Sequence, residues 1–81
     1  MSRIALGRIF AKFNVCDYGF NYKGQKLIPV DSIISISTYS AIKNNSIVCY
    51  KTIASEIESV IVEDSVDDID NYLRSIGTII E

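Results

Sequence analysis

Histidine is absent from this 81-residue chain. Its absence removes the commonest general base, the usual metal ligand and every histidine-based catalytic triad. A catalytic site would need Cys16 or Cys49 as a nucleophile without an imidazole, or a pair of carboxylates. The sequence brings no such set together. We therefore expect a protein that is not an enzyme and that requires no cofactor and no metal.

Long uncharged apolar runs are also missing, since none approaches the ~20 residues that a membrane helix needs. Residues 1–13 carry Arg3, Arg8 and Lys12 through what would be the apolar core of a signal peptide. Two cysteines in a chain without a secretion signal are expected to be free thiols rather than a disulfide. We expect a cytoplasmic protein that does not act at a membrane surface.

What the chain has in abundance is isoleucine, which occurs 15 times against three leucines. β-Branched side chains are stiff at χ1 and pack well on a pleated surface, so the bias favours strands over helices. Isoleucine codons are AT-rich, which would fit a phage or a low-GC bacterium as the source. The length predicts one small domain, residues 1–81, with material for a single core.

Alternation of apolar and polar residues predicts about six short strands before residue 63. The first places Ala11 and Phe13 on one face and Lys12 on the other, and the only proline, Pro29, marks an edge or a strand boundary. Lys23-Gly24-Gln25 is interpreted as a turn. Residues 53–61 also match helical spacing, so a helix there remains an alternative. The expected strands are 3–15, 18–22, 26–30, 33–39, 47–54 and 58–62.

The last quarter of the chain predicts one amphipathic helix at about 65–77. Its apolar stripe recurs at helical spacing, Ser65 can cap the start, and acidic residues crowd the end where the helix dipole is positive. Arg74 follows Asp70 by four residues, which favours an ion pair, and Gly77 can stop the helix. The stripe consists of Val66, Ile69, Leu73 and Ile76. Strands followed by one helix predict an α+β domain in which a bent antiparallel sheet, or a small barrel-like sandwich of six to seven strands, is closed by that helix.

Charge is distributed unevenly along the chain. Residues 1–26 hold five basic residues and one acidic residue, whereas residues 55–81 hold one arginine and eight carboxylates. The simplest interpretation is that the two halves neutralise each other within one fold. A functional interpretation is an acidic surface that binds a basic groove of another protein or of a second copy. Its residues would be Glu63, Asp64, Asp67, Asp68 and Asp70.

The element order resembles the pleckstrin-homology-like domains, including the GRAM type. Three pieces carry the resemblance: the run 20–33 with Ile28-Pro29 followed by Asp31-Ser32-Ile33, the strand Ser59-Val60-Ile61-Val62, and the closing helix after Asp64-Ser65. The resemblance implies a barrel-like sandwich, usually of seven strands, that binds proteins, peptides or lipid head groups without catalysis. The residues matching the family's anionic-ligand region would be Arg8, Lys12, Lys23 and Lys26.

Two further patterns suggest a nucleic-acid site and a calcium site. Aromatic residues interleave with lysines over residues 10–23, which is typical of single-stranded nucleic-acid binding, but Asp17 and Lys23 break the base-stacking motif and the net charge of −2 opposes phosphate. The aspartates at the helix start lack the mid-loop glycine and final glutamate of a calcium loop.

We expect a small protein-interaction or regulatory module that acts through its acidic helix or an exposed strand edge. The alternative is a module that binds lipid head groups or single-stranded nucleic acid through its basic N-terminal half.

Overall fold

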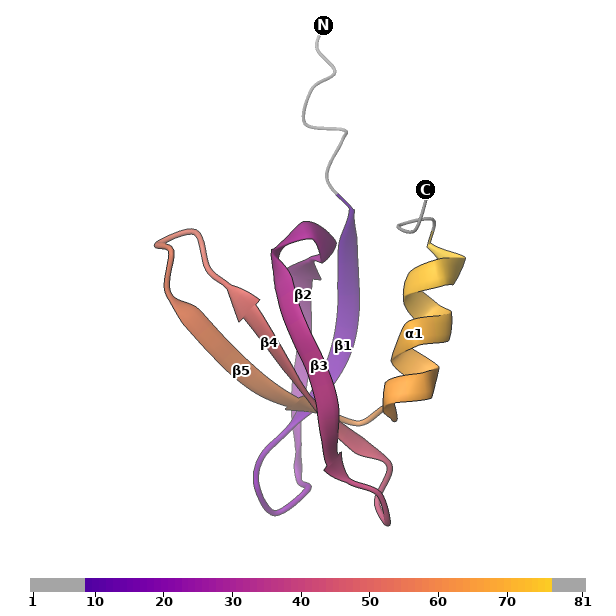
Figure 1. Cartoon of the computed structure of the whole chain (residues 1–81). Coiled ribbons are helices and arrows are strands. Elements are labelled where there is room, and N and C mark those ends of the chain that lie inside the picture. The colour runs from indigo at the N-terminus through magenta and orange to yellow at the C-terminus, as the bar shows by residue number, and fades with distance from the viewer. Residues whose placement is uncertain (1–8, 77–81) are drawn as a thin grey trace, which may run out of the picture.

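The computed structural model describes residues 9–76, which form five strands and one α-helix (Figure 1). The strands are β1 (Phe10–Cys16), β2 (Tyr22–Pro29), β3 (Ile33–Ser40), β4 (Asn45–Lys51) and β5 (Ile57–Val62), and the helix is α1 (Val66–Ser75). A short 3₁₀ helix, Val30–Ser32, joins β2 to β3. The α+β class with one C-terminal helix is therefore confirmed.

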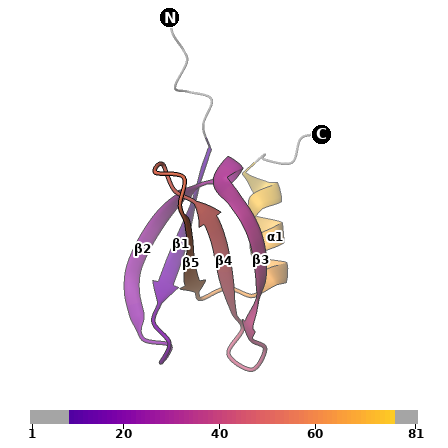
Figure 2. The same ribbon diagram turned by 60° about the vertical axis from the view of Figure 1, so that its left-hand side comes forward.

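The five strands form one antiparallel sheet in the order β2-β1-β5-β4-β3 (Figure 2). Strand β5 pairs with β4 along its whole length, but it pairs with β1 only where Val15 and Cys16 meet Val62 and Ile61. Beyond that point β1 and β5 diverge (Figure 1). The sheet is thus two strongly paired units, β1–β2 and β3–β4–β5, held together at one end.

The prediction of six or seven strands is wrong for residues 9–76, because the expected turn at Lys23-Gly24-Gln25 lies inside β2. The chain turns earlier, over residues 17–21, where the Asp17 carboxylate accepts hydrogen bonds from the backbone N–H groups of Gly19 (2.8 Å) and Asn21 (3.0 Å). The glycine instead serves a bulge: Gly24 has φ +111° where the β1–β2 register shifts. The expected strands over 18–22 and 26–30 therefore become one loop and one longer strand.

Closure into a barrel is not observed among the described residues. Strands β2 and β3 are the two edges of the sheet, although they are consecutive in the chain. Three residues of 3₁₀ helix suffice to connect them, so the sheet must curl until its edges approach at that corner. The arrangement is an open, curled sheet. The part of the first expected strand before residue 9 and the helix stop expected at Gly77 lie outside the described residues.

The alternative helix over residues 53–61 is not formed, and Ile57–Val62 is a strand. Ser55 has φ +65° in the turn between β4 and β5, and this turn interrupts any helical path. After the turn, Val60, Ile61 and Val62 place β-branched side chains in the sheet, where these residues pack well. The predicted break at Ser55-Glu56 is confirmed.

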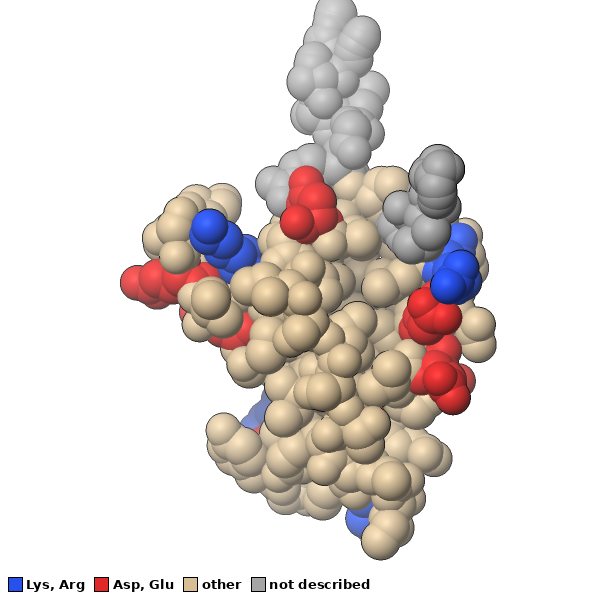
Figure 3. All heavy atoms as spheres, in the orientation of Figure 1, with Lys and Arg blue, Asp and Glu red and all other residues tan. Residues whose placement is uncertain are grey.

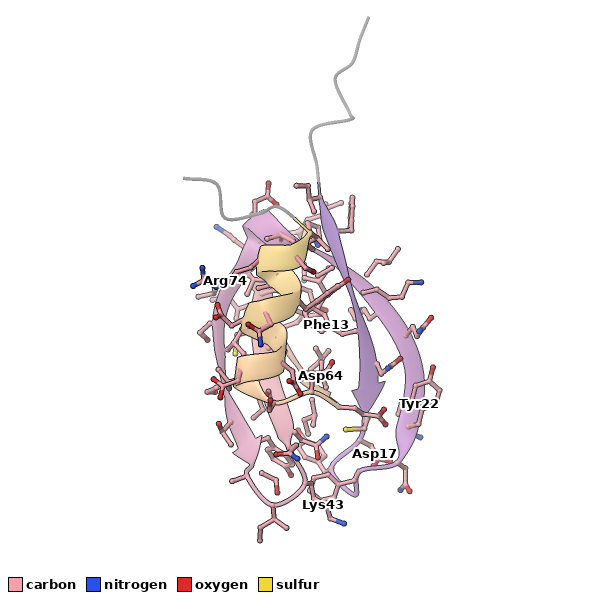
Figure 4. The ribbon with its side chains drawn as sticks, turned by 90° about the vertical axis from the view of Figure 1, so that its right-hand side faces the viewer. Phe13, Asp17, Tyr22, Lys43, Asp64 and Arg74 are labelled. Atoms are coloured by element: carbon pink, nitrogen blue, oxygen red, sulfur yellow. The ribbon has the colours of Figure 1, made fainter. Side chains whose placement is uncertain are left out.

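The core lies between the concave face of the sheet and α1 (Figures 1 and 4). Alternate residues of β1, Ala11 and Phe13, are buried as predicted, and Ile69 of α1 is 1% exposed. Tyr72, Leu73 and Ile76 pack against the same cluster. The complete buried cluster is Ala11, Phe13, Ile28, Val48, Tyr50, Val62 and Ile69.

Two buried polar side chains fix the path from β5 into α1. Asn45 donates to the Val62 carbonyl at 3.0 Å, and Ser46 donates to the Asp64 carbonyl at 2.6 Å. Ser65 then caps the helix, because its Oγ accepts the Asp68 backbone N–H at 3.1 Å. The predicted cap is confirmed, and the position of the helix start is set by β4.

Candidate functional site

The acidic residues lie between the end of β5 and the middle of α1, in different local surroundings. The Glu63 backbone N–H donates to the Asn14 carbonyl of β1 at 3.0 Å, whereas Asp67 lines a small hollow beside the β3–β4 turn. Asp70 accepts a hydrogen bond from Arg74 Nε at 3.1 Å, the predicted i,i+4 pair. Five acidic residues therefore follow one another over residues 63–70, and one of them, Asp70, is engaged in an ion pair within the helix.

Asp64 and Asp68 are the acidic pair whose charges influence each other. Partial burial raises the pKa of the Asp64 carboxyl above its usual value, and the neighbouring charge of Asp68 raises it further. Figure 4 shows Asp64 at the base of α1, where its side chain is half-buried. A carboxylate in this position contributes less to a binding surface than an exposed one.

The basic residues expected to bind an anionic ligand also separate. Lys12 is paired with Leu27 across β1 and β2, and Lys26 is paired with the buried Phe13. Side chains alternate between the two faces of a sheet, so Lys12 and Lys26 point to opposite faces. Lys23 stands 3.9 Å from the Asp17 carboxylate, and Arg8 lies outside the described residues. The structure thus does not gather these lysines into one anion site.

An apolar groove lies at the other end of the sheet from the β1–β2 loop, between the β2–β3 corner and the β4–β5 hairpin. It encloses about 750 Å³. Many exposed apolar side chains of the described chain line it or stand beside it: Phe10 47%, Leu27 58%, Ile34 54%, Ile53 99% and Ile57 68% exposed. An apolar concentration of this kind on the surface marks an interaction site in most proteins. The residues lining the groove are Phe10, Lys26, Leu27, Pro29, Asp31, Ser32, Ile33, Ile34, Tyr50, Lys51, Thr52, Ile53 and Glu58.

Tyr50 forms the polar floor of the apolar groove. Its hydroxyl donates to Glu58 Oε1 at 2.9 Å, and the Lys26 ammonium lies 5.9 Å from the centre of its ring. Burial, followed by the hydrogen bond to Glu58, raises the pKa of the Tyr50 hydroxyl, and Lys26 opposes this shift. The Tyr50 hydroxyl at the floor is therefore uncharged near neutral pH. The charged residues that line the groove are two lysines and two carboxylates.

Sequence reasoning missed the apolar groove because its residues come from all five strands and two connections. Ile53 and Ile57 were assigned to strands or to an alternative helix, in which an isoleucine is expected to be buried. Their exposure follows from the divergence of β5 from β1, which no local pattern encodes. The expected edge segment 26–30 does contribute Lys26, Leu27 and Pro29 to the groove.

The surroundings of Cys16 disfavour nucleophilic chemistry. Burial, aided by the nearby charges of Glu63 and Asp17, raises the pKa of the Cys16 thiol, which disfavours the reactive thiolate. Both thiols are free. Within residues 9–76 no group of three or more histidine, cysteine or carboxylate side chains is arranged to hold a metal ion.

Comparison with protein families, curated proteins and solved structures finds no match to this chain. The helix of the described region is also too short and too polar to cross a membrane. Any assignment of function must therefore start from the surfaces described above.

Proposed function

We propose that the chain is a small protein-interaction module without catalytic activity, and that its binding site is the apolar groove. The observation that carries this proposal is the concentration of exposed apolar side chains around that hollow. Leu27 and Ile34 are more than half exposed, and Ile53 is 99% exposed at the tip of a hairpin. Each apolar side chain of this size, once covered by a partner, contributes about 1.5–3 kcal/mol.

The occupant proposed for the groove is an extended segment of another protein with apolar side chains at alternate positions. Strand β2 is an edge of the sheet, and its last residues line the groove. A segment laid along β2 would add a strand to the sheet and direct every second side chain into the hollow. Because Lys26 and Lys51 are balanced by Asp31 and Glu58, the segment should carry little net charge.

The other expected surfaces have weaker geometric support. Asp64 is partly buried and Asp70 is paired with Arg74, whereas Lys12 and Lys26 of the alternative anion site point to opposite faces of β1 and β2. A regulatory role through the acidic helix and a role in binding lipid head groups therefore remain secondary to the groove.

Selection from a random peptide library tests the proposal, with binding of the enriched peptides measured by calorimetry. We expect peptides with alternating apolar residues, and we expect their affinity to fall at least about tenfold for Leu27→Asp and Ile53→Asp. Ile42→Asp is the matched control, because Ile42 is 92% exposed at the tip of the other long hairpin. Equal losses for Ile42→Asp and Ile53→Asp, or no enrichment of apolar peptides, would refute the proposal. Measurement of the mass in solution would show whether a second copy fills the groove instead.

A further inference from the structure

Three aromatic side chains from two distant segments meet at the end of the molecule opposite the apolar groove. Tyr39, near the end of β3, has its ring centre 5.8 Å from that of Phe20 and 6.5 Å from that of Tyr18, both in the β1–β2 loop. The rings are tilted by 52° and 57° and do not stack on one another. We call Tyr18, Phe20 and Tyr39 the aromatic cluster.

The loop that presents the aromatic cluster is held rigidly. Besides its two side-chain hydrogen bonds, Asp17 accepts the Phe20 N–H through its carbonyl at 2.9 Å and donates its own N–H to the Asn21 carbonyl at 2.9 Å. The hydrogen bonds from the Asn21 and Gly19 N–H groups lower the pKa of the Asp17 carboxyl, so it stays ionised near neutral pH. The aromatic residues are thus fixed in position without a ligand.

Phe20 adopts a backbone conformation that does not suit it. Its φ is +67°, a left-handed conformation that is strained for a bulky residue and that glycine adopts freely. The neighbouring Gly19 does not share this conformation, and a Cβ there would meet only ordinary contacts at 3.4 and 3.5 Å. Turn chemistry alone would favour glycine at position 20. The phenylalanine is instead explained by the place of its ring beside Tyr39.

The surroundings of the aromatic cluster are basic compared with the rest of the surface. The Lys43 ammonium lies 5.6 Å from the centre of the Phe20 ring, and the Lys23 side chain is 60% exposed beside Asp17. Figure 3 shows acidic patches on the hairpin, at the upper corner and along α1, whereas the lower end of the visible face is mainly tan with small blue areas. Figure 4 places Lys43 at that lower end.

From this geometry we infer that the aromatic cluster is a binding site for single-stranded nucleic acid. Tyr18 is 81% exposed, so a ring face is open to solvent, and every base offers a π-face to stack on it. Tilted rings let successive unstacked bases each meet a different ring, while Lys23 and Lys43 lie where the connecting phosphates would pass. The net charge of −2 limits the affinity, but most of the acidic residues lie elsewhere on the surface. This site is independent of the apolar groove and of its proposed partner.

Fluorescence anisotropy of a short labelled oligothymidylate at low salt tests the inference. Tyr18→Ala should weaken binding by about 5- to 150-fold, the range for loss of one base–aromatic stack, whereas Tyr18→Phe should retain it. An abasic oligonucleotide of equal length loses every stack, so it should bind the unmodified protein more weakly than the intact oligonucleotide binds the Tyr18→Ala variant. Ile42→Ala, beside Lys43 in the sequence but without a ring, is the matched control.

Phe20→Gly tests the contribution of the ring to binding separately from its effect on folding. Glycine suits the left-handed conformation, so the variant should stay folded by circular dichroism while oligonucleotide affinity falls by about the same factor as for Tyr18→Ala. Lys43→Gln should reduce the slope of log affinity against log salt by about one unit. The inference is overturned if the oligonucleotide does not bind, if the abasic strand binds equally well, or if Tyr18→Ala and Ile42→Ala behave alike. Binding of a proline-rich peptide to the same rings, without binding of the oligonucleotide, would also overturn it.

Discussion

The hydroxyl of Tyr72 accepts a hydrogen bond from the backbone N–H of Lys12 at 2.9 Å. The tyrosine ring meets Phe13 edge-on, with ring centres 6.1 Å apart and planes at 82°. Strand β1 pairs with β5 only at its last two residues, so the Lys12 N–H has no neighbouring strand to bind on that side. Through the Tyr72 hydroxyl, α1 therefore supplies the hydrogen-bond acceptor that a paired strand would supply, in the region where β1 and β5 have diverged.

Tyr72→Phe tests this replacement. The ring contact with Phe13 remains, but the Lys12 N–H loses its acceptor, so we expect the free energy of unfolding to fall by about 1 kcal/mol. Urea unfolding followed by circular dichroism gives the value. Tyr18→Phe removes the hydroxyl of an 81% exposed ring and should leave the urea midpoint unchanged. An unchanged midpoint for Tyr72→Phe as well would show that water satisfies Lys12 equally well.

The two faces of α1 should respond differently to substitution. Ile69→Ala deletes a side chain that is 1% exposed and should cost about 2–5 kcal/mol, a large part of the stability of so small a domain. Asp67→Asn and Asp70→Asn lie on the exposed side and should together cost about 1 kcal/mol or less. Thermal unfolding of the three variants measures this. If the aspartate variants were as unstable as Ile69→Ala, the acidic residues of α1 would be shown to stabilise the fold.

Tyr50 should titrate later than an ordinary tyrosine. Its pKa is raised in the folded protein, chiefly by burial and then by the Glu58 hydrogen bond, above an ordinary value of 10.0. The unfolded chain then releases this proton first as the pH rises, so stability should fall above pH 10.0 and stay unaffected below it. Absorbance of the phenolate against pH should show a titration step above pH 10.0, and Tyr50→Phe should remove that step. Loss of an early-titrating tyrosine instead would contradict the assignment.

Asp64→Asn should stabilise the protein near neutral pH. Burial and the Asp68 charge raise the Asp64 pKa above 3.8, so the folded state holds this proton more tightly than the unfolded state. Stability therefore falls as the pH rises from 3.8 through the folded pKa, and the loss persists at neutral pH. Asparagine removes that loss, so the gain in urea midpoint should disappear below pH 3.8. Glu56→Gln, in the β4–β5 turn, controls for the change in net charge, and an equal gain there would contradict the local explanation.

Local sequence chemistry predicted the elements whose signals are local. Ser65 as the cap, the Asp70–Arg74 pair, the alternating faces of β1 and the buried Ile69 all depend on spacings within one element. The turn at residues 23–25 was predicted wrongly because glycine marks both turns and bulges. The Asp17 side chain, through bonds to Gly19 and Asn21, made residues 17–21 the turn instead.

The sequence singled out the aromatic residues over 10–23, but it could not assemble either candidate site, because each site joins segments far apart in the chain. The apolar groove requires β1 and β5 to diverge, so that Ile53 and Ile57 are exposed beside Leu27. The aromatic cluster requires the β1–β2 loop to meet the end of β3, which brings Tyr18 and Phe20 to Tyr39. The expected anion site does not form, because the register between β1 and β2 places Lys12 and Lys26 on opposite faces of the sheet.

The sequence by itself determined the class of the domain: β-branched alternation produced antiparallel strands, and one apolar stripe behind a serine cap produced the closing helix. Hydrogen-bond capping and side-chain periodicity act over a few residues, so they can be recognised without the fold. Tertiary structure alone decided which apolar side chains remained exposed and which aromatic side chains met. Those outcomes depend on strand order and on the curl of the sheet, which arise from contacts summed over the whole chain.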